Sequence, residues 1–370
     1  MKARTLCSAV LALALMTTGC APGVRPSSPP VAEGKSPALH DYRPATGFGG
    51  PIIANGKLVW LSWTKPDGKD RKIQVLDLQS SKSSVFEPTS GYTVGYPVVM
   101  DGYAVYGEFP VSDFNPQAWR LVARNLQTGE VKLLASSDVG GMQLTFAADA
   151  GKVVWLESDW TNMEKSWSRV KVCDLVHGDV HTLVEVKFPE NIESVDISGA
   201  NVVYSKFLTD QTNGSRHFKS DVYVYNLTTG DTHPVTTTHD AWQAKIFGDN
   251  VAWKSAPHFD AYGDIYVSSI SSGTSHQVTQ NGAALGVTDP TIGDGFVTWR
   301  QNLGKHVIPV YSIPENKTFD LDQGEVYAPK AFGKYLVWRW EPSSDDARIR
   351  WWTPAERKQG SWTAENPPSF

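Results

Sequence analysis

The chain has 370 residues, a formal charge of −5, 41% hydrophobic and 11% aromatic residues, and three cysteines. This length accommodates one large domain or two ordinary ones. The apolar and aromatic content excludes a disordered chain, and three cysteines are too few for a disulfide scaffold. The weak acidity, spread along the chain, argues against nucleic-acid binding, which needs a basic face.

The first twenty residues have the pattern of an export signal. Lys2 and Arg4 give a positive start, and the apolar stretch Leu6–Met16 is too short to span a bilayer. The following Thr-Thr-Gly-Cys20 resembles the lipobox of bacterial lipoproteins, although Thr17 stands where Leu is usual. We therefore expect a lipoprotein signal peptide over residues 1–19 and an exported chain. Lipid on Cys20 would hold it at a membrane of the cell envelope, and an ordinary secretory signal is the alternative.

The remainder divides into a tether and a folded part. Residues 20–50 are rich in proline and poor in apolar residues, which predicts a flexible tether after the lipidated cysteine. Residues 51–370 are the predicted folded domain. Within it, Cys173 lies in an alternating strand pattern, and we expect a small apolar core residue rather than a nucleophile.

A unit repeats seven times beyond the tether. Each copy has a glycine turn, two or three apolar residues and an aromatic anchor, as in Gly151-Lys-Val-Val-Trp155. The anchors follow one another at about 39 to 49 residues, a spacing typical of structural repeats. They are Trp60, Tyr106, Trp155, Tyr204, Trp253, Trp299 and Trp338.

Each anchor is followed by a second strand signature. The clearest is Val222-Tyr-Val-Tyr-Asn-Leu-Thr-Thr-Gly230, which alternates with period two, ends in turn residues and precedes another short strand. One unit is thus four antiparallel strands, A to D, and four strands in about 46 residues is the period of a β-propeller blade. We predict an all-β fold, a single propeller of seven four-stranded blades, with six as the fallback if the last unit does not close the ring. No closing strand is evident unless residues near Tyr42 to Gly47 supply one.

The repeat unit resembles the TolB-like propeller repeats of bacterial envelope proteins. The resemblance is carried by the glycine turn with its anchor, the Ile-Tyr-Val-type strand and the short final strand. The resemblance covers residues 51 to about 360. It implies a propeller with a binding face built from loops at one end of the ring. Such repeats occur in scaffold proteins, sensors, peptidase side domains and lyases, so the resemblance leaves the function open.

The connections between strands indicate which end of the ring is functional. The A–B and C–D turns are short, whereas the B–C loops are long and irregular, so we expect the site at the B–C/D–A end. Charged and aromatic residues after the anchors lead toward that end. The predicted binding face consists of Glu108, Glu157, Trp160, Lys206, Lys254, Arg300, Arg339 and Trp340. An acidic side and a basic side would suit a charged partner, and ion pairs between blades are the alternative interpretation.

Three histidines offer a second hypothesis. His217, His239 and His258 fall in loops expected at the same end, and histidines of this number can bind zinc or manganese. This would suit a metal-assisted lyase or hydrolase acting on acidic polysaccharide. No His-Glu-x-x-His or Cys-x-x-Cys spacing supports it.

Together these features predict a non-catalytic binding or scaffold module for an envelope protein or glycan. We expect no cofactor and no nucleic-acid partner, a monomer, and membrane contact through the lipid alone. Whether the chain is also an enzyme stays open at this point.

Overall fold

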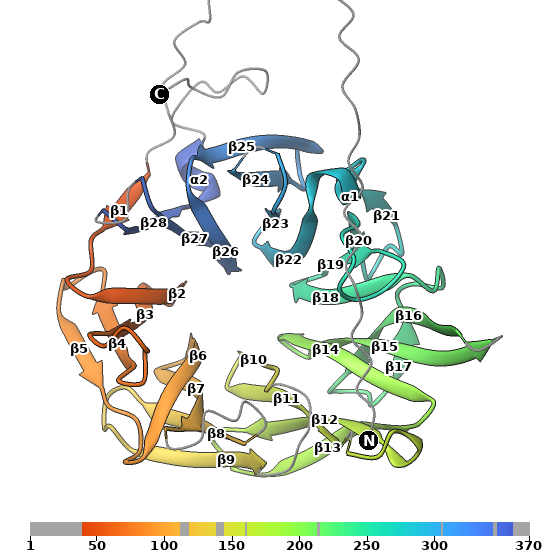
Figure 1. The fold of residues 1–370 in the computed structure, drawn as a ribbon, viewed down its shortest axis with the longest axis horizontal. Helices are drawn as coiled ribbons and strands as arrows, with labels where there is room; N and C mark the ends of the chain where they lie inside the picture. Colours follow the sequence, from red (N-terminus) through yellow and green to blue (C-terminus); the bar gives the residue numbers. More distant parts are fainter. Residues whose placement is uncertain are drawn as a thin grey trace, which may run out of the picture. The chain divides into compact units, whose positions relative to one another are not determined.

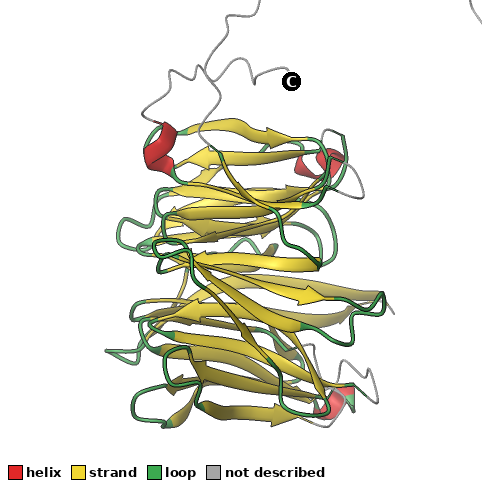
Figure 2. Ribbon diagram, turned by 90° about the vertical axis from the view of Figure 1, so that its left-hand side faces the viewer, coloured by secondary structure: helices red, strands yellow, loops and turns green. Residues whose placement is uncertain are grey.

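The computed structural model describes residues 39–111, 118–137, 144–159, 161–212, 215–304, 306–342 and 346–357. Within these residues the fold is a ring of seven four-stranded antiparallel sheets (Figure 1). The predicted seven-bladed β-propeller is therefore confirmed, and the six-bladed fallback is excluded. Seen from the side, the described chain is almost all strand (Figure 2). No helix in these ranges is long and apolar enough to cross a bilayer.

The first four blades are each built from consecutive strands, with the innermost strand first. Blade 1 consists of β2 (Gly47–Ala54), β3 (Lys57–Trp63), β4 (Lys72–Asp77) and β5 (Ser83–Phe86). Blade 2 consists of β6 (Tyr92–Met100), β7 (Tyr103–Pro110), β8 (Trp119–Asn125) and β9 (Val131–Ser137). Blade 3 consists of β10 (Phe146–Asp149), β11 (Lys152–Asp159), β12 (Trp167–Asp174) and β13 (Val180–Lys187). Blade 4 consists of β14 (Glu190–Ser198), β15 (Asn201–Thr212), β16 (Ser215–Asn226) and β17 (Thr232–Pro234).

Blades 5 and 6 follow the same order, and blade 7 does not. Blade 5 consists of β18 (Ala241–Phe247), β19 (Asn250–Ser255), β20 (Asp264–Ser269) and β21 (Ser275–Gln277). Blade 6 consists of β22 (Val287–Gly293), β23 (Phe296–Gln301), β24 (Val307–Ser312) and β25 (Lys317–Gln323). Blade 7 consists of β26 (Val326–Phe332), β27 (Tyr335–Trp340), β28 (Arg348–Trp352) and β1 (His40–Tyr42). The short helices are η1 (Met163–Lys165), α1 (Gly282–Leu285) and α2 (Pro354–Arg357).

The ring is closed by the first strand of the chain. β1 pairs antiparallel with β28, which places His40 opposite Trp351 and Tyr42 opposite Ile349. The His40 ring stacks on Trp351 with centroids 5.2 Å apart. The propeller therefore begins at His40 and not at residue 51, and residues 40–50, predicted as tether, belong to blades 7 and 1. The remainder of the predicted tether that precedes residue 39 lies outside the described residues.

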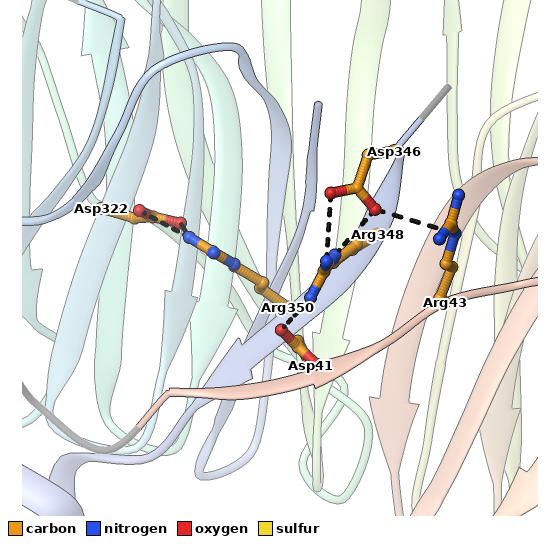
Figure 3. Close-up of polar contacts among 6 residues, drawn as sticks. All are labelled: Asp41, Arg43, Asp322, Asp346, Arg348 and Arg350. Atoms are coloured by element: carbon orange, nitrogen blue, oxygen red, sulfur yellow. Dashed lines mark hydrogen bonds and ion pairs between the residues drawn. The ribbon is translucent and has the colours of Figure 1, made fainter. Parts of the chain in front are cut away.

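Charged side chains add to this closure (Figure 3). Arg348 Nη1 lies 3.0 Å from Asp41 Oδ2, and Arg348 Nη2 lies 3.0 Å from Asp346 Oδ2. Arg43 Nε lies 3.7 Å from the other oxygen of Asp346. Because these pairs are partly exposed, each contributes little to stability, and the backbone pairing of β1 carries most of the closure.

The hydrophobic core lies between blades. One cluster joins Leu61 and Val75 of blade 1 to Val99 and the anchor Tyr106 of blade 2. The other interfaces have equivalent clusters, up to that between blades 7 and 1. The period-two alternation therefore buries one residue in two against each neighbouring blade, as the repeat predicts. Cys173 belongs to one of these clusters and is fully buried, as expected.

Candidate binding site at the ring axis

The predicted binding-face residues occupy two different strand registers. Glu108, Glu157 and Lys206 stand two residues after their anchors. Lys254, Arg300 and Arg339 stand one residue after theirs. Because successive side chains of a strand point to opposite faces of the sheet, the two sets face different neighbours.

The first set forms ion pairs within single blades. Glu108 is fully buried, its Oε1 accepts a hydrogen bond from Thr89 N at 2.8 Å, and Arg120 lies 3.5 Å from its other oxygen. Lys206 donates to Glu190 within blade 4 at 2.8 Å.

Glu157 has similar contacts in blade 3. Its Oε1 accepts a hydrogen bond from the anchor Trp155 at 3.0 Å, and Lys171 lies 3.8 Å from its Oε2. Each of the three residues thus contacts an oppositely charged residue of its own blade, and not one of the next blade as the alternative interpretation expects.

The second set reaches toward the next blade. Lys254 is fully buried, and its Nζ donates to Phe259 O at 2.6 Å and lies 3.4 Å from Thr288 of blade 6. Burial lowers the pKa of Lys254. Arg339 of blade 7 donates to Phe48 O of blade 1 at 2.9 Å. These two cations therefore bridge adjacent blades.

The remaining residues of that face are dispersed. Arg300 is exposed and pairs loosely with Asp289 at 3.5 Å. Trp340 is half-buried, with the Arg350 guanidinium carbon 3.4 Å from its ring centroid. Trp160 and Cys20 lie outside the described residues.

Two of the three histidines can be placed in the structure, and each lies beside a carboxylate. His239 Nδ1 lies 2.6 Å from Asp221 Oδ2, and His258 contacts Asp260. The side chain of His217 is not among those described. No group of three His, Cys, Asp or Glu side chains able to hold a metal occurs among the residues that are.

A further set of equivalent residues surrounds the ring axis. On each innermost strand, one residue pairs with the residue that precedes the aromatic anchor. Figure 1 shows these seven strands nearest the centre of the ring. The equivalent residues, called the axial residues below, are Ile52, Val98, Ala147, Asp196, Lys245, Thr291 and Lys330.

The axial residues divide the ring into two parts. In blades 1 to 3 they are the apolar Ile52, Val98 and Ala147, and in blades 4 to 7 they are all polar or charged. The polar ones also hold neighbouring blades together. Asp196 Oδ2 accepts a hydrogen bond from Ile246 N of blade 5 at 3.1 Å, and Thr291 Oγ1 accepts one from Ala331 N of blade 7.

A β-bulge lies just before the axial residue in most innermost strands. In β18 and β22 it places Gln243 and Asp289 in the left-handed region, with φ of 58° and 51°. These residues form a relay around the ring: Gln243 N donates to Glu193 at 3.1 Å, and Asp289 N donates to Gln243 Oε1 at 3.0 Å. Non-glycine residues in this conformation cost free energy and cluster at functional sites.

The charges of this half of the ring act on one another across the axis. Lys330 is exposed to solvent, yet the surrounding protein lowers its pKa, and the charge of Lys245 lowers it further. The charge of Asp196 acts in the opposite direction on Lys330, although Asp196 lies three blades away. Burial raises the pKa of both Asp196 and Glu193.

Sequence reasoning missed these residues although a signal for them exists. Each axial residue stands eight positions before its aromatic anchor, from Ile52 before Trp60 to Lys330 before Trp338. Four of the seven, Ile52, Val98, Thr291 and Lys330, directly follow a proline. Following the repeat backward from the anchor, rather than forward, would have aligned them.

The comparisons with known proteins show the fold. No protein-family model and no curated protein sequence matches the chain. Among solved structures it is similar to the β-propeller domain of the Trilobed protease from Pyrococcus furiosus, with 12% identity, a TM-score of 0.60, and coverage of 84% of this chain and 94% of that one.

Peptidases with propellers are also similar. The Pyrococcus horikoshii acylaminoacyl peptidase matches with 11% identity and a TM-score of 0.57 over 79% of this chain, and this chain spans 48% of the peptidase. TolB from Acinetobacter baumannii matches with 14% identity over 78% of each chain, at a TM-score of 0.42. At such identities the likeness establishes a β-propeller, and membership of the TolB-like family stays a prediction.

Proposed function

We propose that this chain is an exported binding module, held at a membrane by lipid on Cys20, whose propeller binds an envelope protein or glycan at the axial residues of blades 4 to 7. The lipobox-like sequence and the TolB-like repeat signature support the envelope location. The propeller supports the binding role, because it is a rigid ring whose loops present one end to a partner.

The observation that carries the proposal is the asymmetry of the axial residues. Desolvating charge costs folding free energy, and a ring can be filled by apolar residues, as blades 1 to 3 demonstrate. In the other half of the ring the axial position is occupied by the charged residues Asp196, Lys245 and Lys330 instead of apolar ones. A fold that carries such a cost in one place is most simply explained by ligand binding there.

Site-specific photo-crosslinking tests this proposal. Tyr327 and Lys334 are both exposed and lie at opposite ends of the same strand, β26: Tyr327 near its start and Lys334 just after its end. A photoreactive phenylalanine analogue at Tyr327 should crosslink an envelope component in intact cells, and the same analogue at Lys334 should not. Equal crosslinking from both positions, or crosslinking from Lys334 alone, would exclude a site at this end of the ring.

The anchor is tested separately. Wild-type protein should incorporate labelled palmitate and sediment with membranes, and Cys20→Ser should do neither. A Cys20→Ser protein that still sediments with membranes refutes lipidation as the anchor.

A further inference from the structure

Two ammonium groups at the ring axis lack partners. Lys245 of blade 5 and Lys330 of blade 7 are axial residues on either side of Thr291 of blade 6. In the described part of the chain, neither lysine has a hydrogen-bond acceptor or an ion-pair partner within bonding distance. This contrasts with Lys206 and Lys254, whose Nζ atoms both donate hydrogen bonds.

The acidic groups nearby are already engaged. Asp196 accepts a hydrogen bond from Ile246 N. Asp289 accepts one from the Gln243 amide at 3.2 Å and pairs with Arg300. The carboxylates near the two lysines therefore accept hydrogen bonds from other donors and form no hydrogen bond with either lysine.

The positive charges of the two lysines repel each other at the ring axis. The charges of Lys245 and Arg300 act against the protonation of Lys330, whereas those of Asp289 and Asp196 favour it, so the two lysines repel each other in a site that also holds carboxylates. Thr291 Oγ1 accepts its hydrogen bond from Ala331 N, which leaves its own O–H free to serve as a donor. Blades 5 to 7 thus present two cations and a hydroxyl donor on consecutive innermost strands.

We infer that Lys245, Thr291 and Lys330 form a binding site for one anionic group, a carboxylate or a phosphate. The inference rests on the proposed function, since it names the chemistry of the ligand group that the axial site accepts. An anion placed between the two lysines supplies the missing acceptors and offsets their mutual repulsion. Such charge-assisted hydrogen bonds are among the stronger polar contacts in proteins.

Inorganic phosphate is a suitable probe of this site. The full chain is titrated with phosphate in a calorimeter, and its thermal unfolding is followed in phosphate and in sodium chloride of equal ionic strength. Wild type should be stabilised by phosphate beyond the effect of chloride, because a ligand that binds the folded state raises the melting temperature. Lys245→Gln and Lys330→Gln should each bind phosphate about ten-fold more weakly, which corresponds to about 1.4 kcal/mol.

Lys57→Gln is the matched control, because Lys57 is a paired lysine of the same propeller, 2.8 Å from Asp77, and its loss should leave phosphate affinity unchanged. The inference is overturned if phosphate and chloride act alike on wild type, or if both axial variants bind phosphate as wild type does. The crosslink from Tyr327 separates this result from the proposed function. If that crosslink persists while phosphate has no specific effect, the binding module is supported and the anion site is refuted. If phosphate binds but the crosslink is absent, the anion site is supported and the proposed binding module is refuted.

Discussion

Asp322 forms a deeply buried ion pair between blades 6 and 7, and its removal tests the packing between them. Its side chain is 2% exposed and that of Arg350 is 17% exposed. Asp322 of blade 6 accepts hydrogen bonds from Arg350 Nη1 at 3.0 Å and from the anchor Trp338 Nε1 at 2.7 Å, both in blade 7. Asp322→Ala therefore leaves a buried cation and a buried indole N–H without an acceptor.

The expected cost follows from this burial. Breaking a buried pair by removing one partner costs about 3–5 kcal/mol. For a propeller of about 310 residues, the usual unfolding entropy per residue converts this into a fall in melting temperature of about 5 to 8 °C. Asp322→Asn keeps an acceptor for Trp338 but loses the charge, so its effect should be intermediate.

Figure 3 also contains the control. Asp346 pairs with Arg348 in the same blade, but their side chains are 28% and 33% exposed. Because partly exposed pairs contribute about 0–1 kcal/mol, Asp346→Ala should lower the melting temperature by less than about 2 °C. Calorimetry at pH 7 measures both variants. If Asp322→Ala costs no more than Asp346→Ala, the reasoning from burial is wrong.

Three other predictions concern the closure, the axis and the thiol. Deleting the chain through Tyr42 removes β1. Amide hydrogen exchange in β28 should then accelerate at least about ten-fold, while exchange in β15 of blade 4 does not change. Uniform acceleration in all blades would show that β1 does not stabilise blade 7 locally. Lys330→Gln should raise the free energy of unfolding at pH 7 by about 0.2–1 kcal/mol, because solvent screens the charge of an exposed side chain. The pKa of Lys330 is lower in the folded than in the unfolded state, so the penalty for its charge is full below the folded pKa and fades as pH rises toward the ordinary lysine value. Urea denaturation should therefore give a smaller gain at pH 10 than at pH 7, and no gain at pH 7 contradicts the prediction. Burial raises the pKa of the Cys173 thiol, so a disulfide reagent should modify it at least about 100-fold more slowly in native than in urea-unfolded protein, and rapid native modification would contradict its place in the core.

The repeat made the fold predictable, because its signal is repeated seven times. The anchors, such as Trp155 and Trp338, must fill the space between blades, and that requirement fixes an aromatic residue at a regular spacing. The closing strand has no such signal. β1 is three residues long, and its identity depends on β28 at the other end of the chain, which no local pattern records.

The candidate site was less predictable for a related reason. The axial position accepts residues as different as Ile52 and Lys330, so it has no common residue type to find. The charges after the anchors were easier to see, but Glu108 and Lys254 are both fully buried. Counting forward from an anchor finds these charges but does not show that they are buried, because burial depends on residues of neighbouring strands and blades.

The pairing of β1 with β28 also determines the order in which this molecule can be assembled. Blades 1 to 6 are each built from contiguous sequence and can form as the chain lengthens, whereas blade 7 needs the first and the last strands together. β1 therefore stays unpaired until residues 348–352 have been synthesised. Contacts between segments so distant in the sequence form slowly. An unpaired edge can pair with other chains, and a strand of only three residues that contains Asp41 and precedes Arg43 is a poor template for such pairing. Closure of the ring therefore distinguishes a complete chain from an incomplete one. A chain truncated before β28 keeps blades 1 to 6, but its first strand has no partner and the ring stays open.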